Sequence, residues 1–186
     1  MGLYYWIRKK IGKADSNDEI VIARKLGVKI GERCVIRDNA RKVFSSEPYL
    51  VTIGNHVEIT SGVRFLTHEG SIWVFREEEE HRNEDCFAPI VVGNNVFIGM
   101  KSIIMPGIHI GSNVVIGAGS IVTKDVPDNT VVAGIPAKKI CDLSQFKERL
   151  FQSEKKIIVP TKKMSREQKK TYLMKNFPEW FETAGD

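Results

Sequence analysis

The sequence predicts an all-β solenoid, a parallel β-helix assembled from repeats of six residues. Aliphatic residues recur at every sixth position: Val92, Ile98, Ile104, Ile110, Ile116 and Val122. A small or β-branched residue follows four positions after each of them: Val96, Ser102, Ile108, Val114, Ser120 and Val126. Glycine often comes directly after the aliphatic residue, as at Gly93 and Gly99. Neither an α-helix, with a period of 3.6, nor an alternating strand, with a period of 2, produces this spacing, whereas a hexapeptide β-helix does.

Each hexad is expected to form one short strand and a turn, so that three hexads form one triangular coil. The aliphatic residue points inward, the small residue fits a corner, and glycine tolerates the turn geometry. Coils then stack at about 4.8 Å and bury their apolar faces against one another. Residues 92–127 hold uninterrupted hexads. An earlier block predicts further coils, with hexads that start at Ile30, Ile36, Ile53, Ile59 and Phe65 and with Cys34, Ala40, Val57 and Val63 at the small position.

The pattern divides the chain into three parts. Residues 1–27 form an N-terminal extension, residues 28–141 the β-helix with an inserted loop at 71–91, and residues 142–186 a helical tail. The apolar and basic start of the chain favours a short amphipathic helix packed on protein over one that rests on a membrane. In the tail, residues 144–151 and 165–177 are expected to be short amphipathic helices, the second opening with the capping-box pattern "SREQ".

Composition narrows the class of protein. The content of 42% hydrophobic and 27% charged residues is that of a folded domain, and no apolar run approaches the ~20 residues that span a bilayer. The first residues lack a signal-peptide core, so a cytoplasmic location is expected. The net charge of +5 comes without a nucleic-acid-binding motif, so no nucleic-acid partner is predicted. Cys34, Cys86 and Cys141 are too widely spaced to predict a disulfide framework or a zinc site.

The hexad pattern fails at one place. The hexad that starts at Phe65 has Glu69 where a small residue belongs, and residues 71–91 follow no pattern. A loop therefore leaves the β-helix directly after His68, and insertions in solenoids often lie on the binding face. Histidine can accept a proton near pH 7, which suits a general base. Spacing alone leaves two interpretations of His68 open, a catalytic base or a histidine at the edge of a loop.

Residues 27–141 resemble the hexapeptide-repeat acyltransferases. The most specific part, "PIVVGNNVFIGMKSIIMPGIHIGSNVVIGAGSIVTKDVPDNTVVAGIPAKKI", is similar to the coenzyme-A-binding half of the galactoside and maltose O-acetyltransferases. The segment "EPYLVTIGNHVEITSGVRFLTHEG" resembles enzymes that acetylate sugars in capsule, O-antigen or exopolysaccharide assembly. The resemblance implies a left-handed β-helix, a homotrimer with active sites between adjacent subunits, and acetyl-CoA as the donor. The spacing of the cysteines and histidines predicts no metal.

The resemblance also implies residue roles. His68 corresponds to the catalytic base, and either Glu69 or Glu47 is a candidate to orient it. The donor would be contacted by Gly99, Met100, Ala118, Thr123, Lys124 and Lys138. Met100 departs from the smaller residue of many relatives, and Cys141 replaces a common basic residue, so Lys138 or Lys139 would take over its phosphate contact. Apart from the resemblance, the position of the inserted loop makes Glu69, Trp73 and His81 candidates to contact the acceptor. For Trp73 the alternative is packing of the loop against the next subunit.

The predicted activity is transfer of an acetyl group from acetyl-CoA to a sugar hydroxyl in surface polysaccharide or lipopolysaccharide biosynthesis. An antibiotic acetyltransferase would share the fold, the donor and the histidine. A non-catalytic scaffold would need neither His68 nor a coenzyme-A-binding half. The γ-type carbonic anhydrases use the same kind of prism, but they need two of three zinc-binding histidines close together. Here the histidines are separated by 12, 13 and 28 positions, which argues against such a site.

Overall fold

The structure is a computed structural model and describes residues 16–154, 156 and 158–181. The helix predicted at the very start of the chain lies outside these residues. The chain divides into two compact units, Met1–Lys147 and Glu148–Asp186. The first unit contains the strands and the candidate functional site. No helix among the described residues is long and apolar enough to cross a membrane.

Short, mostly parallel strands of the first unit form three sheets. The first sheet is four-stranded, in the order β1 (Lys29–Ile30), β3 (Val51–Ile53), β6 (Ile90–Val92) and β9 (His109–Ile110). The second is six-stranded and contains β2 (Val35–Ile36), β4 (Val57–Ile59), β7 (Val96–Ile98), β10 (Val114–Ile116), β12 (Thr130–Gly134) and β13 (Ala137–Asp142). The third is three-stranded and contains β5 (Arg64–Phe65), β8 (Ile103–Ile104) and β11 (Ile121–Val122).

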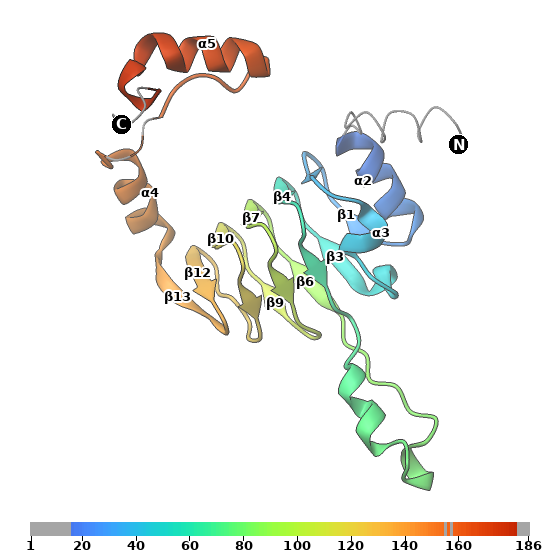
Figure 1. The fold of residues 1–186 in the computed structure, drawn as a ribbon. Coiled ribbons are helices and arrows are strands. Elements are labelled where there is room, and N and C mark those ends of the chain that lie inside the picture. The colour runs from blue at the N-terminus through green and yellow to red at the C-terminus, as the bar shows by residue number, and fades with distance from the viewer. Residues whose placement is uncertain (1–15, 155, 157, 182–186) are drawn as a thin grey trace, which may run out of the picture. The chain divides into compact units, whose positions relative to one another are not determined.

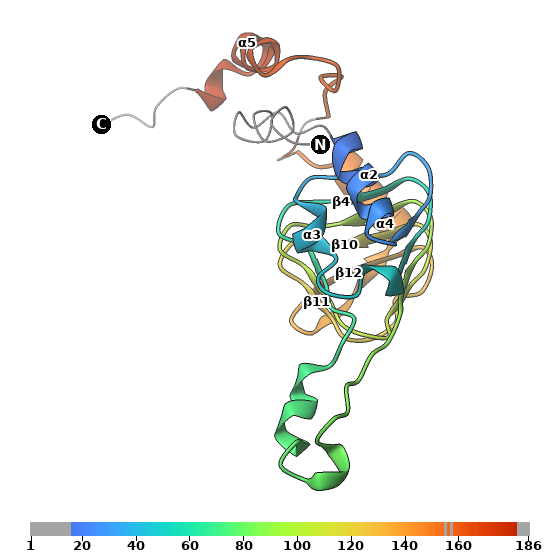
Figure 2. The ribbon, with the colours of Figure 1, turned by 90° about the vertical axis from the view of Figure 1, so that its right-hand side faces the viewer.

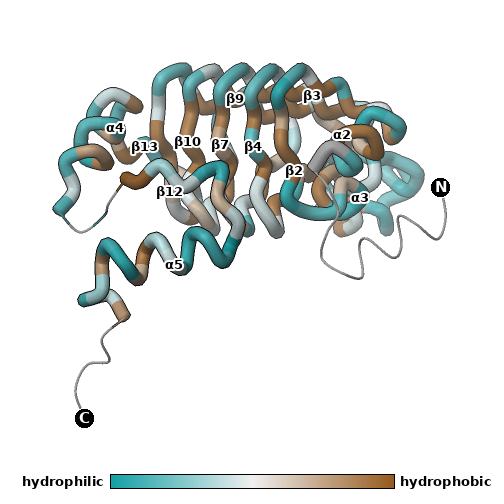
Figure 3. Tube along the Cα trace, turned by 90° about the horizontal axis from the view of Figure 1, so that it is seen from above, coloured by the Kyte–Doolittle hydropathy of each residue, from teal (hydrophilic) through white to brown (hydrophobic). Residues whose placement is uncertain are grey.

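The chain visits the three sheets in turn, and each pass around them forms one coil (Figure 1). Equivalent positions of successive coils lie in register, as in the pairing of Ile59 with Ile98 and of Ile98 with Ile116. The predicted aliphatic positions from Val92 to Val122 are all buried, and so are the predicted small positions from Val96 to Val126. Figure 3 shows the same repeat: hydrophobic segments recur at matching places in neighbouring coils. The six-residue period is therefore confirmed as the pattern of the core.

Polar ladders stabilise one corner of the coils. His56, Asn95, Asn113 and Asn129 each have a φ between 55° and 58°, a left-handed conformation that asparagine tolerates better than most residues. Their side chains hydrogen-bond from coil to coil: His56 Nδ1 with Asn95 Oδ1 at 2.8 Å, Asn95 Nδ2 to Asn113 Oδ1 at 2.9 Å, and Asn113 Nδ2 to Asn129 Oδ1 at 3.0 Å. His56 thus has a structural partner at this corner.

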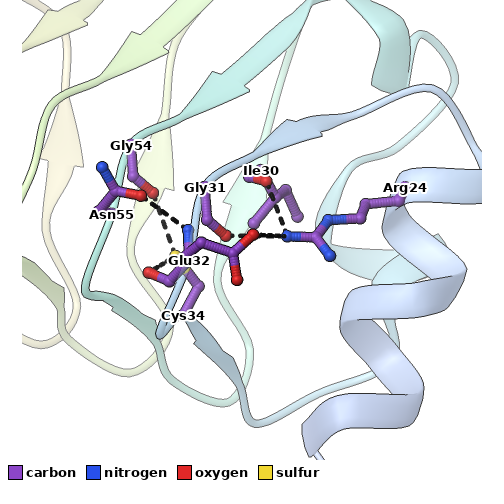
Figure 4. A network of polar contacts seen from close by, with 7 residues as sticks. All are labelled: Arg24, Ile30, Gly31, Glu32, Cys34, Gly54 and Asn55. Atoms are coloured by element: carbon purple, nitrogen blue, oxygen red, sulfur yellow. Dashed lines mark hydrogen bonds and ion pairs between the residues drawn. The ribbon is translucent and has the colours of Figure 1, made fainter.

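The N-terminal end of the coils is covered by α2 (Ser16–Lys25). Arg24 donates from Nη2 to the carbonyl oxygens of Ile30 and Gly31 and to Oε1 of Glu32, at 3.0 to 3.1 Å (Figure 4). The buried Glu19 accepts a hydrogen bond from the backbone N–H of Ala40. Ala40 is buried as expected, but it begins the short helix α3 (Ala40–Val43) instead of completing a hexad turn. The first coil is therefore irregular between β2 and β3, where η1 (Pro48–Leu50) also lies.

At the other end, β12 and β13 form an antiparallel hairpin that ends the parallel stacking. Helix α4 (Leu143–Phe151) follows, and the division between the two units falls within it. The second unit contains α5 (Arg166–Asn176) and η4 (Pro178–Trp180). Ser165 and Gln168 form a capping box at the start of α5, as their spacing predicts.

The inserted loop connects β5 to β6 and extends away from the sheets (Figure 2). It contains two short 3-10 helices, η2 (Gly70–Phe75) and η3 (Glu79–His81). Its two ends pair with each other. Glu69 N donates to Cys86 O at 2.8 Å, and Ala88 N donates to Thr67 O at 2.9 Å. This pairing fixes the base of the loop next to His68.

Candidate active site

His68 lies where the loop leaves the third sheet. Phe65, the last residue of β5, is fully buried and stacks on Phe44, and the chain then runs through Leu66 and the buried Thr67 to His68. His68 also forms a β-bridge with Phe87 on the returning side of the loop. The two rings meet edge to face, with centroids 6.4 Å apart. The histidine is thus held by backbone on both sides, and 42% of its side chain stays exposed.

The imidazole is paired with a carboxylate from the irregular first coil. Nδ1 of His68 lies 3.0 Å from Oε2 of Glu47 and 3.3 Å from Oγ of Ser46. Glu47 is only 14% exposed and also accepts hydrogen bonds from Thr67 Oγ1 at 2.7 Å and from Ser46 Oγ at 3.0 Å. Of the two carboxylates that the sequence offers to orient His68, the structure brings Glu47 to the ring.

Glu47 is arranged to stay ionised. Burial alone would raise the pKa of its carboxyl group, but the hydrogen bonds from Thr67, His68 and Ser46 outweigh this effect and lower the pKa below its usual value. An ionised Glu47 accepts from Nδ1–H and thereby selects the tautomer in which Nε2 carries a lone pair. Among the described residues Nε2 has no hydrogen-bond partner, so this nitrogen is available to take a proton from a ligand.

A cavity of about 310 Å³ lies beside this pair. It is lined by Glu47, His68, Glu69, Gly70, Ile72, Trp73, Arg76, Asp85, Cys86 and Phe87. Most of these residues belong to the inserted loop, and they combine carboxylates with aromatic and aliphatic side chains. Such a mixture suits a polyol, because carboxylates accept hydrogen bonds from hydroxyl groups while apolar side chains contact C–H groups.

The three predicted acceptor-binding residues are placed differently. Trp73 lines the cavity and is 69% exposed. Glu69 also lines it, but its Oε1 caps η2 by accepting from the backbone N–H of Ser71 at 3.0 Å, and this hydrogen bond lowers the pKa of its carboxyl group. His81 is not among the lining residues. It lies in η3, where Nδ1 is 2.7 Å from Oε2 of Glu84.

The predicted donor-binding residues lie on the two corners that border the third sheet and on the closing hairpin. Gly99, Met100 and Ala118 are at the corner before this sheet, where Gly119 N donates to Met100 O at 2.7 Å. The coils approach so closely there that a Cβ atom on Gly99 would meet Ala118 N at 2.5 Å. Thr123 and Lys124 follow β11 at the other corner of the third sheet. The loop that begins after His68 leaves the same corner at β5, which lies two strands from β11 in this sheet.

On the closing hairpin, Lys138 is exposed, whereas Lys139 forms an ion pair with Asp142 at 2.7 Å. Cys141, on the same hairpin, is buried. Of these two lysines, Lys138 is therefore the one that does not take part in this ion pair.

Several residues of the site were not predicted. Ser46, Thr67, Arg76 and Asp85 carry no motif, and only the alternation of charges in the loop hints at the ion pair that Arg76 forms with Asp85. In the described part of the chain there is no group of three or more histidine, cysteine or acidic side chains arranged to hold a metal ion.

Residues 89–124 match the family model described as the hexapeptide repeat of succinyl-transferase. Protein CapG of Staphylococcus aureus is 49% identical to this chain over 164 residues, which cover 88% of this chain and 90% of CapG.

The fold is also similar to solved structures of acetyltransferases. A hexapeptide-repeat-containing acetyltransferase of Vibrio cholerae is 26% identical, with a TM-score of 0.55 over 73% of this chain and 86% of that chain. The same protein complexed with acetyl coenzyme A has a TM-score of 0.50 over 73% of this chain and 82% of that chain. The polySia-specific acetyltransferase NeuO is 33% identical, with a TM-score of 0.52 over 62% of this chain and 51% of its own.

Proposed function

The chain belongs to the hexapeptide-repeat acetyltransferase family, and on this premise we propose that it transfers an acetyl group from acetyl-CoA to a sugar hydroxyl in surface polysaccharide or lipopolysaccharide biosynthesis. The observation that carries the proposal is the pairing of His68 with Glu47 at the edge of a cavity that suits a polyol. The donor is supported by the relative complexed with acetyl coenzyme A, and the saccharide acceptor by the polySia-specific NeuO.

In the proposed reaction His68 acts as a general base. Its Nε2 takes the proton of the acceptor hydroxyl while the hydroxyl oxygen bonds to the thioester carbonyl carbon. Ionised Glu47 stabilises the imidazolium that forms, as a buried carboxylate does for a catalytic histidine. A tetrahedral oxyanion results, which an N–H donor must stabilise. When the C–S bond breaks, Nε2 returns the proton to the departing sulfur, so no acyl-enzyme is needed.

The donor would lie along the third sheet, between its two corners. Gly99, Met100 and Ala118 would contact the arm that carries the thioester, and Thr123 and Lys124 would contact it from the other corner. Lys138 would bind a phosphate of coenzyme A, because Lys139 is already paired with Asp142. The acceptor would enter beside Trp73 and Glu69, with His81 at the outer part of the loop.

The proposal includes the assembly and the winding that the resemblance implies. The coils would be left-handed, and three copies of residues 28–141 would associate so that each acetyl-CoA lies between neighbours. The half-exposed Met100 and the exposed side chains of the inserted loop suit contacts with a donor or a second subunit. We also propose a cytoplasmic location.

The test is release of free coenzyme A thiol from acetyl-CoA with a panel of nucleotide sugars and oligosaccharides. We expect a sugar to stimulate release, and His68→Ala to reduce it by about 100-fold or more, as loss of a general base predicts. His109→Ala is the matched control, because His109 is exposed and lies outside the cavity. A His68→Ala enzyme with full activity would overturn the mechanism, and failure of every sugar to stimulate the wild type would overturn the proposed acceptor class.

A further inference from the structure

Arg76 is a residue of the cavity that the proposed reaction does not use. It lies at the end of η2 and lines the cavity together with His68 and Glu47. Its Nη2 is paired with Oδ1 of Asp85 and also donates to Glu84 O at 3.3 Å. The guanidinium carbon lies 5.9 Å from the centroid of the Trp73 ring. The orientation of the guanidinium is therefore fixed by an ion pair on one side and an aromatic ring on another.

One buried donor of this guanidinium has no acceptor. Among the described residues, Nε of Arg76 is the buried side-chain nitrogen or oxygen that lacks a hydrogen-bond partner. A buried donor without a partner is costly, and each case in a folded protein calls for a reason. The side chain as a whole is 34% exposed, and the indole of Trp73 beside it is largely exposed. A ligand can bond to Nε–H only when this buried atom is opened to the cavity, and the exposed Trp73 ring can shift to open it while it still lines the cavity.

The chemistry of the cavity restricts what this ligand group is. A carboxylate or phosphate binds arginine best through two parallel donors, but Nη2 is already occupied by Asp85 and Glu84. The cavity also holds three carboxylates, of Glu47, Glu69 and Asp85, against one guanidinium, so an additional anion would be repelled. The free Nε–H therefore suits a single neutral acceptor.

An apolar surface lies next to this donor. Ile72, Trp73 and Phe87 line the same cavity, and Trp73 packs on the guanidinium itself. An acetamido group combines the two features that this arrangement matches, because its carbonyl oxygen accepts one hydrogen bond and its methyl group needs an apolar contact. A plain sugar hydroxyl supplies no methyl group, and a uronic acid supplies an unwanted charge.

We propose that Arg76 is a specificity-determining residue that binds the acetamido carbonyl of the acceptor, so that the enzyme acts on neutral 2-acetamido sugars in preference to plain hexoses and acidic sugars. This inference rests on the proposed function, because it assigns the acceptor class of the same site. It adds a contact on the acceptor side and leaves the roles of His68 and Glu47 unchanged.

The experiment compares matched acceptors by thiol release from acetyl-CoA with the full-length protein. The pairs are N-acetylglucosamine with glucose and N-acetylgalactosamine with galactose, each as methyl glycoside and as uridine-diphosphate sugar, with glucuronate as the acidic probe. Each pair is compared within itself, so the effect of the attached group cancels. For the wild type we expect kcat/KM to be about ten- to a hundredfold higher for the acetamido member, the range of a hydrogen bond to a charged group.

The variant Arg76→Lys keeps the positive charge near Asp85 and Trp73 but removes the Nε–H donor. We expect it to raise KM for the acetamido acceptor until the preference falls to within about threefold, while turnover of the plain hexose stays nearly unchanged. Arg76→Met, which also removes the charge, must lose the preference as well. Arg82→Lys, an exposed arginine of the same loop outside the cavity, is the matched control and must keep it. Thermal unfolding of each variant verifies that it is folded.

The outcomes separate the two proposals. If wild-type enzyme turns over both members of a pair equally, or prefers the acidic probe, the inference is overturned and the proposed function stands. If the wild type prefers the acetamido sugar and both Arg76→Lys and Arg76→Met keep this preference, another residue binds the acetamido group. The assignment to Arg76 is then overturned. If no sugar stimulates thiol release, the proposed function is overturned and the inference fails with it.

Discussion

Glu47 Oε2 lies 3.0 Å from His68 Nδ1, although the two residues are 21 positions apart and come from different coils. The carboxylate reaches the ring from the irregular stretch between α3 and η1, and the histidine comes from the end of β5. Stacking of the first coil on the second brings them together. The contact gives Glu47 a role that can be tested separately from the role of His68, because Glu47 acts through the histidine as a positioning residue.

We expect Glu47→Gln to lower kcat for acetyl transfer by about 10- to 100-fold, because a neutral amide neither fixes the Nδ1–H tautomer as strongly nor stabilises the imidazolium. KM for acetyl-CoA should stay within about twofold, since the predicted donor contacts are on other residues. Steady-state thiol release measures both quantities. The control is Glu58→Gln, which removes a carboxylate whose partner, Arg37, lies outside the cavity. Equal losses in the two variants would show that the effect is not specific to the histidine.

Thr67 holds Glu47 in place by a hydrogen bond. Its hydroxyl donates to Glu47 Oε2 at 2.7 Å, and the residue is fully buried. Thr67→Val keeps the shape but leaves the carboxylate without this donor, which costs about 1–3 kcal/mol of unfolding free energy. We expect a lower midpoint of thermal unfolding together with a severalfold lower kcat. Thr67→Ser restores the hydroxyl and should recover activity. If the serine variant behaves like the valine variant, packing of the methyl group, and not the hydrogen bond, accounts for the loss.

The core could be predicted from the sequence because its period is dictated by local geometry. Ile98 and Ile116 occupy the same inward-facing position in successive coils. Burial therefore repeats every six residues, and the sequence shows this as a period of aliphatic residues. The position of His68 could be predicted for the complementary reason, since the loop begins where the pattern stops. A long insertion at a corner of a solenoid is visible in sequence even when its own conformation is not.

The partners of His68 could not be chosen from the sequence, because they depend on contacts between irregular segments. Glu47 follows a stretch where a short helix replaces a hexad, and no period relates it to His68. Glu69 was the other candidate, and in the structure its carboxylate caps η2. Arg76 and Asp85 approach each other only after the loop has folded back. Side-chain pairing across a loop leaves no periodic trace.

Two neighbouring residues of β10, Ile116 and Val115, are expected to differ in how much their substitution lowers the free energy of unfolding. Ile116 on β10 is fully buried between Ile98 and Val132 in the neighbouring strands, whereas its neighbour Val115 is only partly buried. Ile116→Ala should lower the free energy of unfolding by about 2–5 kcal/mol, because it leaves a cavity in the core. Val115→Ala should cost less than about 1 kcal/mol. Urea unfolding at one fixed protein concentration measures both, and equal costs would contradict the inward orientation of Ile116.

The lowered pKa of Asp38 leads to a prediction of how folding stability depends on pH. Burial alone would raise the pKa of its carboxyl group, but hydrogen bonds from the backbone N–H groups of Gly62 and Asn39, helped by the charges of Arg64 and Lys42, lower the pKa below the ordinary value of 3.8. A carboxyl group whose pKa is lower in the folded than in the unfolded chain stabilises the fold above the unfolded value. This contribution is lost as the pH falls through 3.8 towards the folded pKa.

We therefore expect Asp38→Asn to lower the midpoint of thermal unfolding at pH 7, and the difference from wild type to shrink as the pH falls below about 4. Calorimetry of both proteins between pH 7 and pH 3 measures the difference. The control is Asp142→Asn, which removes one member of an exposed ion pair and should change the midpoint little at either pH. A difference between Asp38→Asn and wild type that stays constant down to pH 3 would contradict a lowered pKa. It would mean that the asparagine disturbs the turn by its shape and not by its missing charge.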